Sequence, residues 1–184
     1  ALLADEIFFT YEAPWRRYRR YLPWRAERFH WLPVGATVEP PARAAKARLA
    51  KHGIPANHKI LLHFGGAHPT HQLAWAFSAL ESALACKALS GRVTLVFLGN
   101  DEGTITRLLG AAAKSHLAPN VRALGQLSAA EASGWLARAD LVLAPFLDGV
   151  SSRRSSLVSA LAHGTAVLTT RGENTDRRLR WHQA

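Results

Sequence analysis

The sequence alternates short, uninterrupted apolar runs with segments of helical periodicity. Five such runs follow residue 58: ILLHFGG (60–66), TLVFLGN (94–100), VRALGQ (121–126), LVLAPF (141–146) and AVLTT (166–170). Apolar runs of this length are typical of strands that are covered on both faces, as in a parallel sheet. We therefore predict an α/β fold with a doubly wound parallel sheet, the strand order 3-2-1-4-5 and helices on both faces.

The segments between the runs show the spacing of helices. Leu73, Phe77, Leu80 and Leu84 recur at intervals of three or four positions and form one apolar stripe. We expect Leu157, Val158 and Leu161 to form the inner face of a second helix. Ser128 and Glu131 have the spacing of a capping box, and His163 precedes a glycine in the position of a helix C-cap. Cys86 lies in an alanine-rich helical pattern, where we expect a small buried thiol.

The first 36 residues follow a different pattern. DEIFFTYE and RFHWLPVG are typical of strands, and WRRYRRYLPW between them is typical of a basic, aromatic helix or turn. We expect these strands to lie outside the main sheet. The linker VEPPARA leads to a predicted helix near Ala42–Lys51, so we place a domain boundary near Gly35–Pro41 and predict domains at residues 1–36 and 37–184.

Composition narrows the possible partners. The net charge of +10 favours nucleic acid, acidic lipid or phosphorylated small molecules. A single cysteine excludes an internal disulfide and a cysteine-based zinc site. We identify neither a transmembrane run nor a signal peptide and expect a cytoplasmic protein. Because the sequence lacks methionine, we interpret it as a piece of a longer protein.

Two adjacent arginines stand at the start of a predicted helix in DGVSSRRSSLVSALAHGTAVLTT (148–170). The free N–H groups of a helix start already carry positive partial charge, so cations are mildly unfavourable there. A bound anion would reverse this, because Gly149 permits a sharp turn, the amides around Ser151 and Ser152 can surround phosphate oxygens, and Arg153 or Arg154 provides a bidentate clamp. On residue types alone, a surface loop with two solvated arginines is an equal alternative.

Ligands of open parallel sheets bind beyond the carboxyl ends of the strands. This rule selects four loops, at Gly65–Gly66, Asn100–Glu102, Gly125–Gln126 and Asp148–Arg154. The sequence contains neither G-x-G-x-x-G nor a P-loop motif, which disfavours ordinary dinucleotide binding and P-loop chemistry. His63, His68 and His71 lack a strong zinc spacing, so we expect no metal and instead expect His68 or His71 to contact a phosphate or hydroxyl group.

The segment ARADLVLAPFLDGVSSRRSSLVSALAHGTAVLTT, with the glycine loop FGGAHPTHQL, resembles a known family. It is similar to the donor-binding half of bacterial two-domain glycosyltransferases with the B-type fold, of retaining family 4 and a DGVSxRR…ALAHG subgroup. The shared features are Ala139 and Asp140, the Asp148 loop and the turn AHGTAV. ADEIFFTYE…RFHWLPVG resembles the end of the acceptor domain and the crossover. The resemblance implies a Rossmann-like donor-binding domain after a short remnant of the acceptor domain. It also implies truncation at the C-terminus, because the sequence ends at RLRWHQA, before the family's usual return helix.

The sequence departs from that family at positions that bind substrate. The family commonly has two glutamates eight positions apart, of which the first contacts the transferred sugar and the second the ribose. Ser151 and Ser159 stand at these positions. The family's arginine and lysine near the glycine loop are replaced by Ala67 or His68 and by His71. We infer that the diphosphate clamp has moved to Arg153 and Arg154.

The resemblance implies a glycosyltransferase that moves a sugar from a nucleotide-sugar donor to a polysaccharide or lipid-linked acceptor. This chain would supply the donor half and would be inactive without the acceptor domain. The expected partners are a nucleoside diphosphate sugar and a saccharide or glycolipid acceptor, with no metal cofactor and no nucleic acid. The predicted catalytic residues are Arg153, Arg154 and Ser151. The predicted substrate-binding residues are Gly65, Gly66, His68, His71, Gly125, Gln126, Asp148, Gly149, Ser152 and Ser159.

Two alternatives remain open. WRRYRRYLPWRAERFHW interleaves arginine with aromatic residues, which is typical of a module that binds single-stranded nucleic acid or an anionic membrane at the inner membrane face. An amphipathic segment that packs its aromatic residues on a sheet explains the same pattern. We expect Trp15–Trp24 to contribute little to nucleotide-sugar affinity. A nucleotide-sugar epimerase on the same fold is the second alternative.

Overall fold

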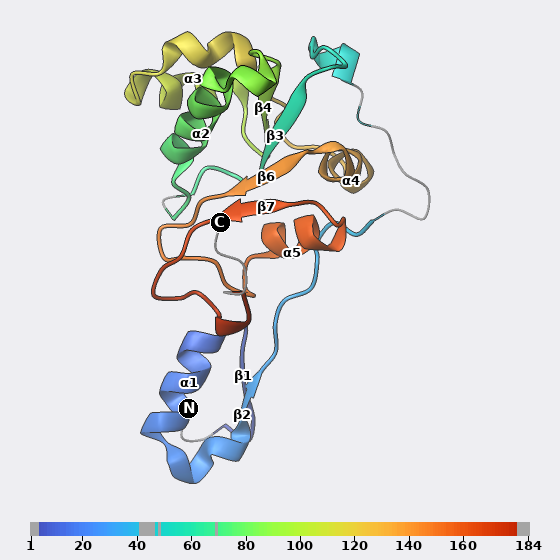
Figure 1. The fold of residues 1–184 in the computed structure, drawn as a ribbon. Coiled ribbons are helices and arrows are strands. Elements are labelled where there is room, and N and C mark those ends of the chain that lie inside the picture. Colours follow the sequence, from blue (N-terminus) through green and yellow to red (C-terminus); the bar gives the residue numbers. More distant parts are fainter. Residues whose placement is uncertain (1–3, 41–46, 48, 69, 180–184) are drawn as a thin grey trace.

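The computed structural model describes residues 4–40, 47, 49–68 and 70–179 and contains a larger and a smaller lobe (Figure 1). The larger lobe is built on a parallel sheet of five strands, β3 (Lys59–Phe64), β4 (Val93–Leu98), β5 (Val121–Ala123), β6 (Leu141–Ala144) and β7 (Val167–Thr169). Their spatial order is β5-β4-β3-β6-β7. This is the predicted order 3-2-1-4-5, and the predicted α/β class is confirmed.

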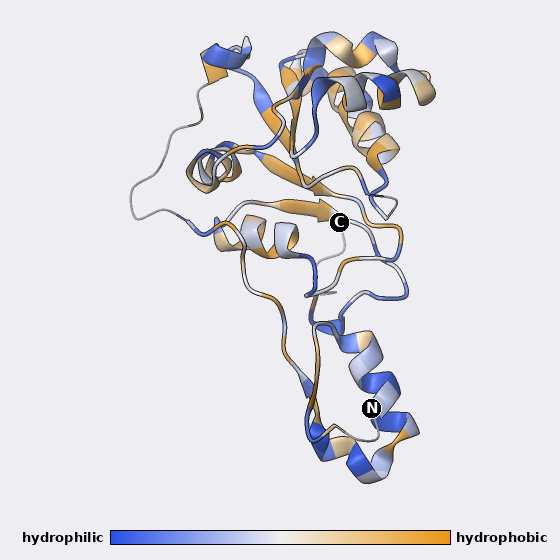
Figure 2. Ribbon diagram, turned by 180° about the vertical axis from the view of Figure 1, so that it is seen from behind, coloured by the Kyte–Doolittle hydropathy of each residue, from blue (hydrophilic) through white to orange (hydrophobic). Residues whose placement is uncertain are grey.

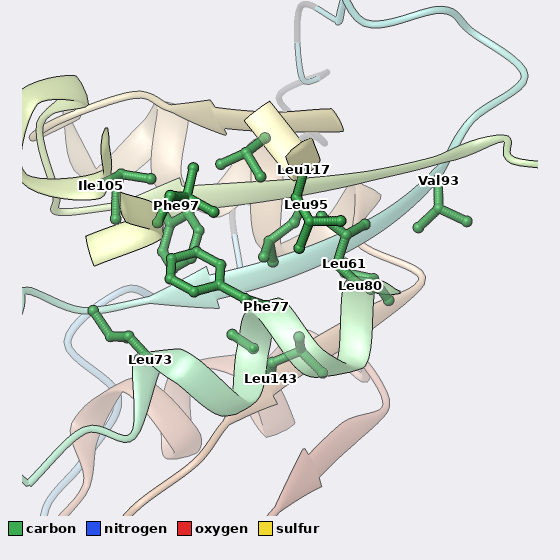
Figure 3. Close-up of a cluster of buried hydrophobic side chains, with 13 residues drawn as sticks. Leu61, Leu73, Phe77, Leu80, Val93, Leu95, Phe97, Ile105, Leu117 and Leu143 are labelled. Atoms are coloured by element: carbon green, nitrogen blue, oxygen red, sulfur yellow. The ribbon is translucent and has the colours of Figure 1, made fainter. Parts of the chain in front are cut away.

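Helices cover both faces of this sheet because the strand side chains alternate between two apolar cores. Leu61, Leu95 and Leu143 pack with the helices α2 (Leu73–Ala85) and α3 (Glu102–Ala111) (Figure 3). Leu62, Val96 and Val142 pack with the helices α4 (Ala129–Arg138) and α5 (Ser155–Ala162). Figure 2 shows the strands as the apolar centre of the larger lobe. Short 3₁₀ turns complete it: η2 (Leu49–His52), η3 (Lys87–Leu89), η4 (Ser115–Asn120) and η5 (Arg177–Leu179).

The smaller lobe contains a separate parallel pair of strands, β1 (Ile7–Phe9) and β2 (Phe29–Trp31), as expected for strands outside the main sheet. Between them the chain forms α1 (Glu12–Tyr21) and the 3₁₀ segment η1 (Pro23–Arg28). Trp15 fastens α1 to the strand pair, since its indole Nε1 donates a hydrogen bond to the Phe29 carbonyl at 2.9 Å. Figure 1 shows α1 beside β1 and β2 and away from α2 and α3.

Several local predictions are confirmed. Ser128 and Glu131 form the capping box of α4, and His163 is the C-cap of α5. Helix α5 begins at Ser155, with Arg154 as its N-cap residue. Most of the predicted helix at Ala42–Lys51 lies outside the described residues. None of the described helices is both long enough and apolar enough to cross a membrane.

The expectation of a buried thiol at Cys86 is wrong. Helix α2 ends at Ala85, and Cys86 follows it with an extended backbone and an exposed side chain. The core contacts of α2 come from the stripe through Leu73, Phe77 and Leu80. Cys86 lies beyond the end of that stripe, so the alanine-rich composition of the helix does not bury it.

His63 near the end of β3 is enclosed in the core. It is 2% exposed, and its ring lies 5.4 Å from that of Phe97 and 5.5 Å from that of His71, between centroids. Burial, and to a lesser extent the charge of His71, lowers the pKa of His63 from 6.5 to about 3. The folded protein therefore holds His63 neutral at a pH where the unfolded chain protonates it.

This burial predicts a loss of stability in mild acid. Between about pH 7 and about pH 5, His63 alone should reduce the free energy of unfolding by about 2 kcal/mol, because only the unfolded state takes up the proton. The contribution is fully present above the unfolded pKa of 6.5 and is lost as the pH falls toward the folded pKa of about 3. Urea unfolding at both pH values measures it. His63→Leu cannot titrate and should flatten the profile; an unchanged profile in this variant would contradict the assignment.

Candidate functional site

The loops that follow the strands of the main sheet are hydrogen-bonded to one another at its carboxyl edge. The amide of Gly65, after β3, donates to the Leu98 carbonyl at 3.0 Å, and the side-chain nitrogen of Asn100 donates to the Gly65 carbonyl at 2.7 Å. The amide of Gly99 donates to the Gly125 carbonyl, also at 2.7 Å. The predicted loops after β3, β4 and β5 therefore form one continuous rim.

The loop after β6 joins the same rim from the other side of β3. The Leu147 amide donates to the Thr70 carbonyl, and the Gln72 amide donates to the Pro145 carbonyl, both at 2.9 Å. Nη1 of Arg154 donates to Thr70 Oγ1 at 3.3 Å. The arginine loop therefore lies next to the loop that follows β3.

Arg153 and Arg154 share one carboxylate. Nη2 of Arg153 donates to Oδ2 of Asp148, and Nη2 of Arg154 donates to Oδ1 of the same side chain. Burial raises the pKa of Asp148, but the Asn174 amide and the charges of Arg154 and Arg153 outweigh it, so the pKa lies below its ordinary value. Asp148 is thus ionised at neutral pH, and the three-residue cluster retains one excess positive charge.

The two arginines extend in different directions from Asp148. The guanidinium of Arg153 lies 4.5 Å from the centroid of the Tyr11 ring in the smaller lobe, whereas that of Arg154 lies 4.4 Å from the Phe146 ring beside the glycine loop. The Arg154 side chain is 13% exposed and that of Arg153 is 30% exposed. The cluster therefore presents one cation to each lobe.

His71 lies between the glycine loop and Phe146. Its ring centroid is 5.1 Å from that of Phe146, and a Cβ added at Gly65 would lie 3.2 Å from the imidazole Cε1. Burial lowers the pKa of His71, and the charge of Arg154 lowers it further. His71 is therefore a neutral hydrogen-bonding group at neutral pH. His68 is exposed, and its Nδ1 lies 2.8 Å from Thr70 Oγ1.

Within the described part of the chain, several buried polar atoms at this edge have no hydrogen-bond partner: Oγ of Ser151, Nδ1 of His71 and Nε of Arg153 and Arg154. Such atoms cost stability unless a further group satisfies them. Among all the residues that the structure describes, no three histidine, cysteine or acidic side chains form a group that could hold a metal ion.

Of the other predicted substrate-binding residues, some are exposed at the rim and some are bound to other parts of the protein. Gly66 and Gln126 are exposed there. The amide of Ser152, expected to face a phosphate, instead donates to Oδ2 of Asp176 at 2.5 Å. Ser159 is fully buried, and its Oγ accepts hydrogen bonds from the amides of Thr37 and Val38. Ser159 is thus enclosed beneath the crossover segment around Thr37, and its hydroxyl binds backbone amides of that segment.

The sequence reasoning missed a fifth loop at this edge, residues 172–176. Asn174 Nδ2 donates to Oδ2 of Asp148 at 3.1 Å, and the Asn174 amide donates to the Asp148 carbonyl at 2.9 Å. The signal was present, because this loop follows the fifth predicted strand and the strand-end rule applies to it equally.

Comparison with solved structures shows which known folds this chain resembles. WaaG, a glycosyltransferase involved in lipopolysaccharide biosynthesis, matches with a TM-score of 0.69 at 20% identity, over 92% of this chain and 45% of that one. Anabaena HepE, determined with UDP and glucose, matches with a TM-score of 0.68 at 17% identity, over 98% and 47%. Sucrose-phosphate synthase from Thermosynechococcus elongatus gives 0.65 at 20%, over 92% and 41%. The chain spans less than half the length of each.

The sheet order and these likenesses define a Rossmann-like domain of the B-type glycosyltransferase fold. The family model described as glycosyl transferases group 1 matches residues 58–179, which is well over half of the chain. The chain therefore belongs to the glycosyl transferases group 1 family. Comparison with curated proteins gives no significant match.

Close packing at Gly149 gives a test of the arginine loop. Gly149 has a φ of +87°, and an added Cβ would overlap Oγ1 of Thr175 and the backbone of Gly172. We expect Gly149→Ala to reduce the free energy of unfolding by about 3 kcal/mol, from the left-handed backbone and the overlap together.

Gly164→Ala is the matched control, since Gly164 has a φ of +69° and open space around its Cβ position. It should cost only about 1 kcal/mol, from the backbone alone. Urea unfolding compares the two variants. Equal losses would show that the loop is not packed as described.

Proposed function

We propose that this chain is the donor-binding half of a glycosyltransferase that transfers a sugar from a nucleoside diphosphate sugar to a polysaccharide or lipid-linked acceptor. Family membership supports glycosyl transfer, and the Asp148 loop supports the choice of donor. The specific assignment to retaining family 4, and to its subgroup with paired arginines, is part of the same proposal.

The observation that carries the proposal is the convergence of Arg153, Arg154 and the start of α5 beside the glycine loop. Two permanent cations share a single carboxylate there, so an anion at this point gains charge-assisted contacts. The start of α5 also carries positive partial charge, which favours an anion at the same point. In the proposed reaction these groups stabilise the leaving diphosphate as the sugar–phosphate bond breaks, without a required metal ion.

His71 has a different role in this proposal. Its lowered pKa makes it neutral at neutral pH, so it adds no charge to the diphosphate. A neutral imidazole can donate a hydrogen bond from one ring nitrogen and accept one at the other. We assign it to a phosphate oxygen or sugar hydroxyl beside Gly65.

Alanine substitutions test the arginine pair. Arg154→Ala should weaken UDP or GDP binding by roughly ten- to a hundred-fold, because a partly buried charge-assisted contact contributes about 1.5–3 kcal/mol. Arg153→Ala should have a smaller effect, since its side chain is the more exposed and lies against Tyr11. Uridine, which lacks phosphate, should bind both variants about as well as it binds the parent.

Calorimetry with UDP, GDP and uridine measures these affinities. Arg107→Ala, on the exposed surface of α3, is the control and should change none of them. If both loop variants bind the diphosphates as tightly as the parent does, the arginines form only a structural ion pair with Asp148 and the proposal is wrong.

An anionic membrane surface is the partner that we propose for the smaller lobe. Arg17, Arg19 and Arg20 are exposed on α1, and Tyr21 and Trp24 beside them are 67% and 68% exposed. Arginines interleaved with exposed aromatic rings are suited to the interface between lipid headgroups and acyl chains. This would bring the protein to a lipid-linked acceptor.

Substitution of the three arginines tests the membrane proposal. Arg17→Gln, Arg19→Gln and Arg20→Gln together should weaken sedimentation with phosphatidylglycerol vesicles by roughly a hundred-fold, at about 1 kcal/mol for each charge. UDP binding should not change, because α1 lies outside the proposed donor site. Lys87→Gln, Arg92→Gln and Arg107→Gln remove the same charge from exposed positions of the larger lobe. Equal losses in both triple variants would indicate attraction by net charge alone.

A further inference from the structure

Asp176 follows β7 at a point where three segments of the chain meet, and it is 1% exposed. Its Oδ1 accepts a hydrogen bond from the Glu12 amide at 2.9 Å, and its Oδ2 accepts one from the Ser152 amide at 2.5 Å. Its own amide donates to the Val150 carbonyl at 3.2 Å. One buried carboxylate thus joins the first turn of α1 to the loop that carries the arginine pair.

The contact between α1 and the segment around Asp176 is reciprocal. Oε2 of Glu12 accepts a hydrogen bond from the Arg177 amide at 2.6 Å, and Oε1 pairs with Arg16. Burial raises the pKa of Glu12, but the Arg177 amide and the Arg16 guanidinium outweigh it and lower the pKa below its ordinary value. Each segment therefore supplies a side-chain carboxyl group as hydrogen-bond acceptor to a backbone amide of the other.

Ser152 extends this link from the larger lobe to the smaller one. Its Oγ donates to the Thr10 carbonyl at 3.1 Å and accepts from the indole Nε1 of Trp31 at 3.2 Å. The next residue, Arg153, lies over the ring of Tyr11. Ser152 and Arg153 thus both contact the smaller lobe, directly beside the amide that Asp176 holds.

We propose that Asp176 is a positioning residue that sets the orientation of Arg153 and Arg154 and couples it to the position of the smaller lobe. This inference rests on the proposed function, because the anion it concerns is the diphosphate of the donor. Without the carboxylate, the amides of Glu12 and Ser152 both lose a charge-assisted acceptor. The loop then relaxes, and the two guanidinium groups lose their shared geometry.

Asp176→Asn tests the inference with little change in side-chain size. We expect UDP affinity to fall about five- to tenfold, while uridine affinity stays within about twofold, because only phosphate contacts depend on the arginines. Amide hydrogen exchange should accelerate together in residues 11–16 and 150–154. Ser152→Ala, which removes the contacts to Thr10 and Trp31 but keeps the carboxylate, should shift both readouts in the same direction by a smaller amount.

Asp140→Asn is the matched control. Asp140 accepts a hydrogen bond from the Ile60 amide at 2.8 Å and pairs with Lys59 and Arg138, so this variant also changes a side chain that accepts a hydrogen bond from a backbone amide. It lies at the amino end of β6, opposite the proposed site. It should reduce stability without changing the ratio of UDP to uridine affinity or the exchange of residues 150–154.

The outcomes separate the two proposals. If the parent binds UDP no more tightly than uridine, the proposed function fails, and the exchange data alone decide whether Asp176 couples the segments. If the parent binds UDP preferentially but Asp176→Asn loses UDP and uridine equally, or exchange accelerates in one segment only, the inference is overturned and Asp176 has a purely structural role.

Discussion

The central position of β3 is the constraint on which the rest of the structure depends. It pairs in parallel with β4 on one side and β6 on the other, and its apolar side chains pack into a separate core on each face of the sheet. Parallel pairing also directs the carboxyl ends of all five strands to one edge. The same pairing that buries Leu61 and Leu62 therefore brings the glycine loop and the arginine loop together.

The main sheet could be predicted because each of its strands is a run of apolar residues that are adjacent in the sequence. An uninterrupted run such as TLVFLGN identifies a doubly covered strand, and a right-handed crossover rule then limits the possible orders. The fate of Cys86 could not be predicted in this way, because composition does not show where α2 ends. The enclosure of Ser159 depends on the path of the crossover around Thr37, which local periodicity does not show.

The site was predictable as a set of loops but not as a set of contacts. The strand-end rule selects loops at one edge of the sheet, and these loops are hydrogen-bonded to one another there. It could not show that Asp148 binds both arginines, since that depends on side-chain rotamers within one turn. Asp176 was harder to find, because its bond to the Glu12 amide joins residues 164 positions apart. A short polar stretch after a strand does not reveal a partner at the other end of the chain.

The geometry of the arginine pair bears on the kind of anion that it would hold. Asp148 offsets the repulsion between two adjacent guanidinium groups and keeps both in fixed orientations, at the cost of competing with any ligand. Arg153 lies toward Tyr11 and Arg154 toward Phe146, yet both guanidinium groups reach the one carboxylate of Asp148. A phosphate group, which is also compact and has several acceptor oxygens, is therefore suited to replace that carboxylate as their shared acceptor. The shared geometry of the pair thus favours a phosphate-bearing ligand over a neutral one.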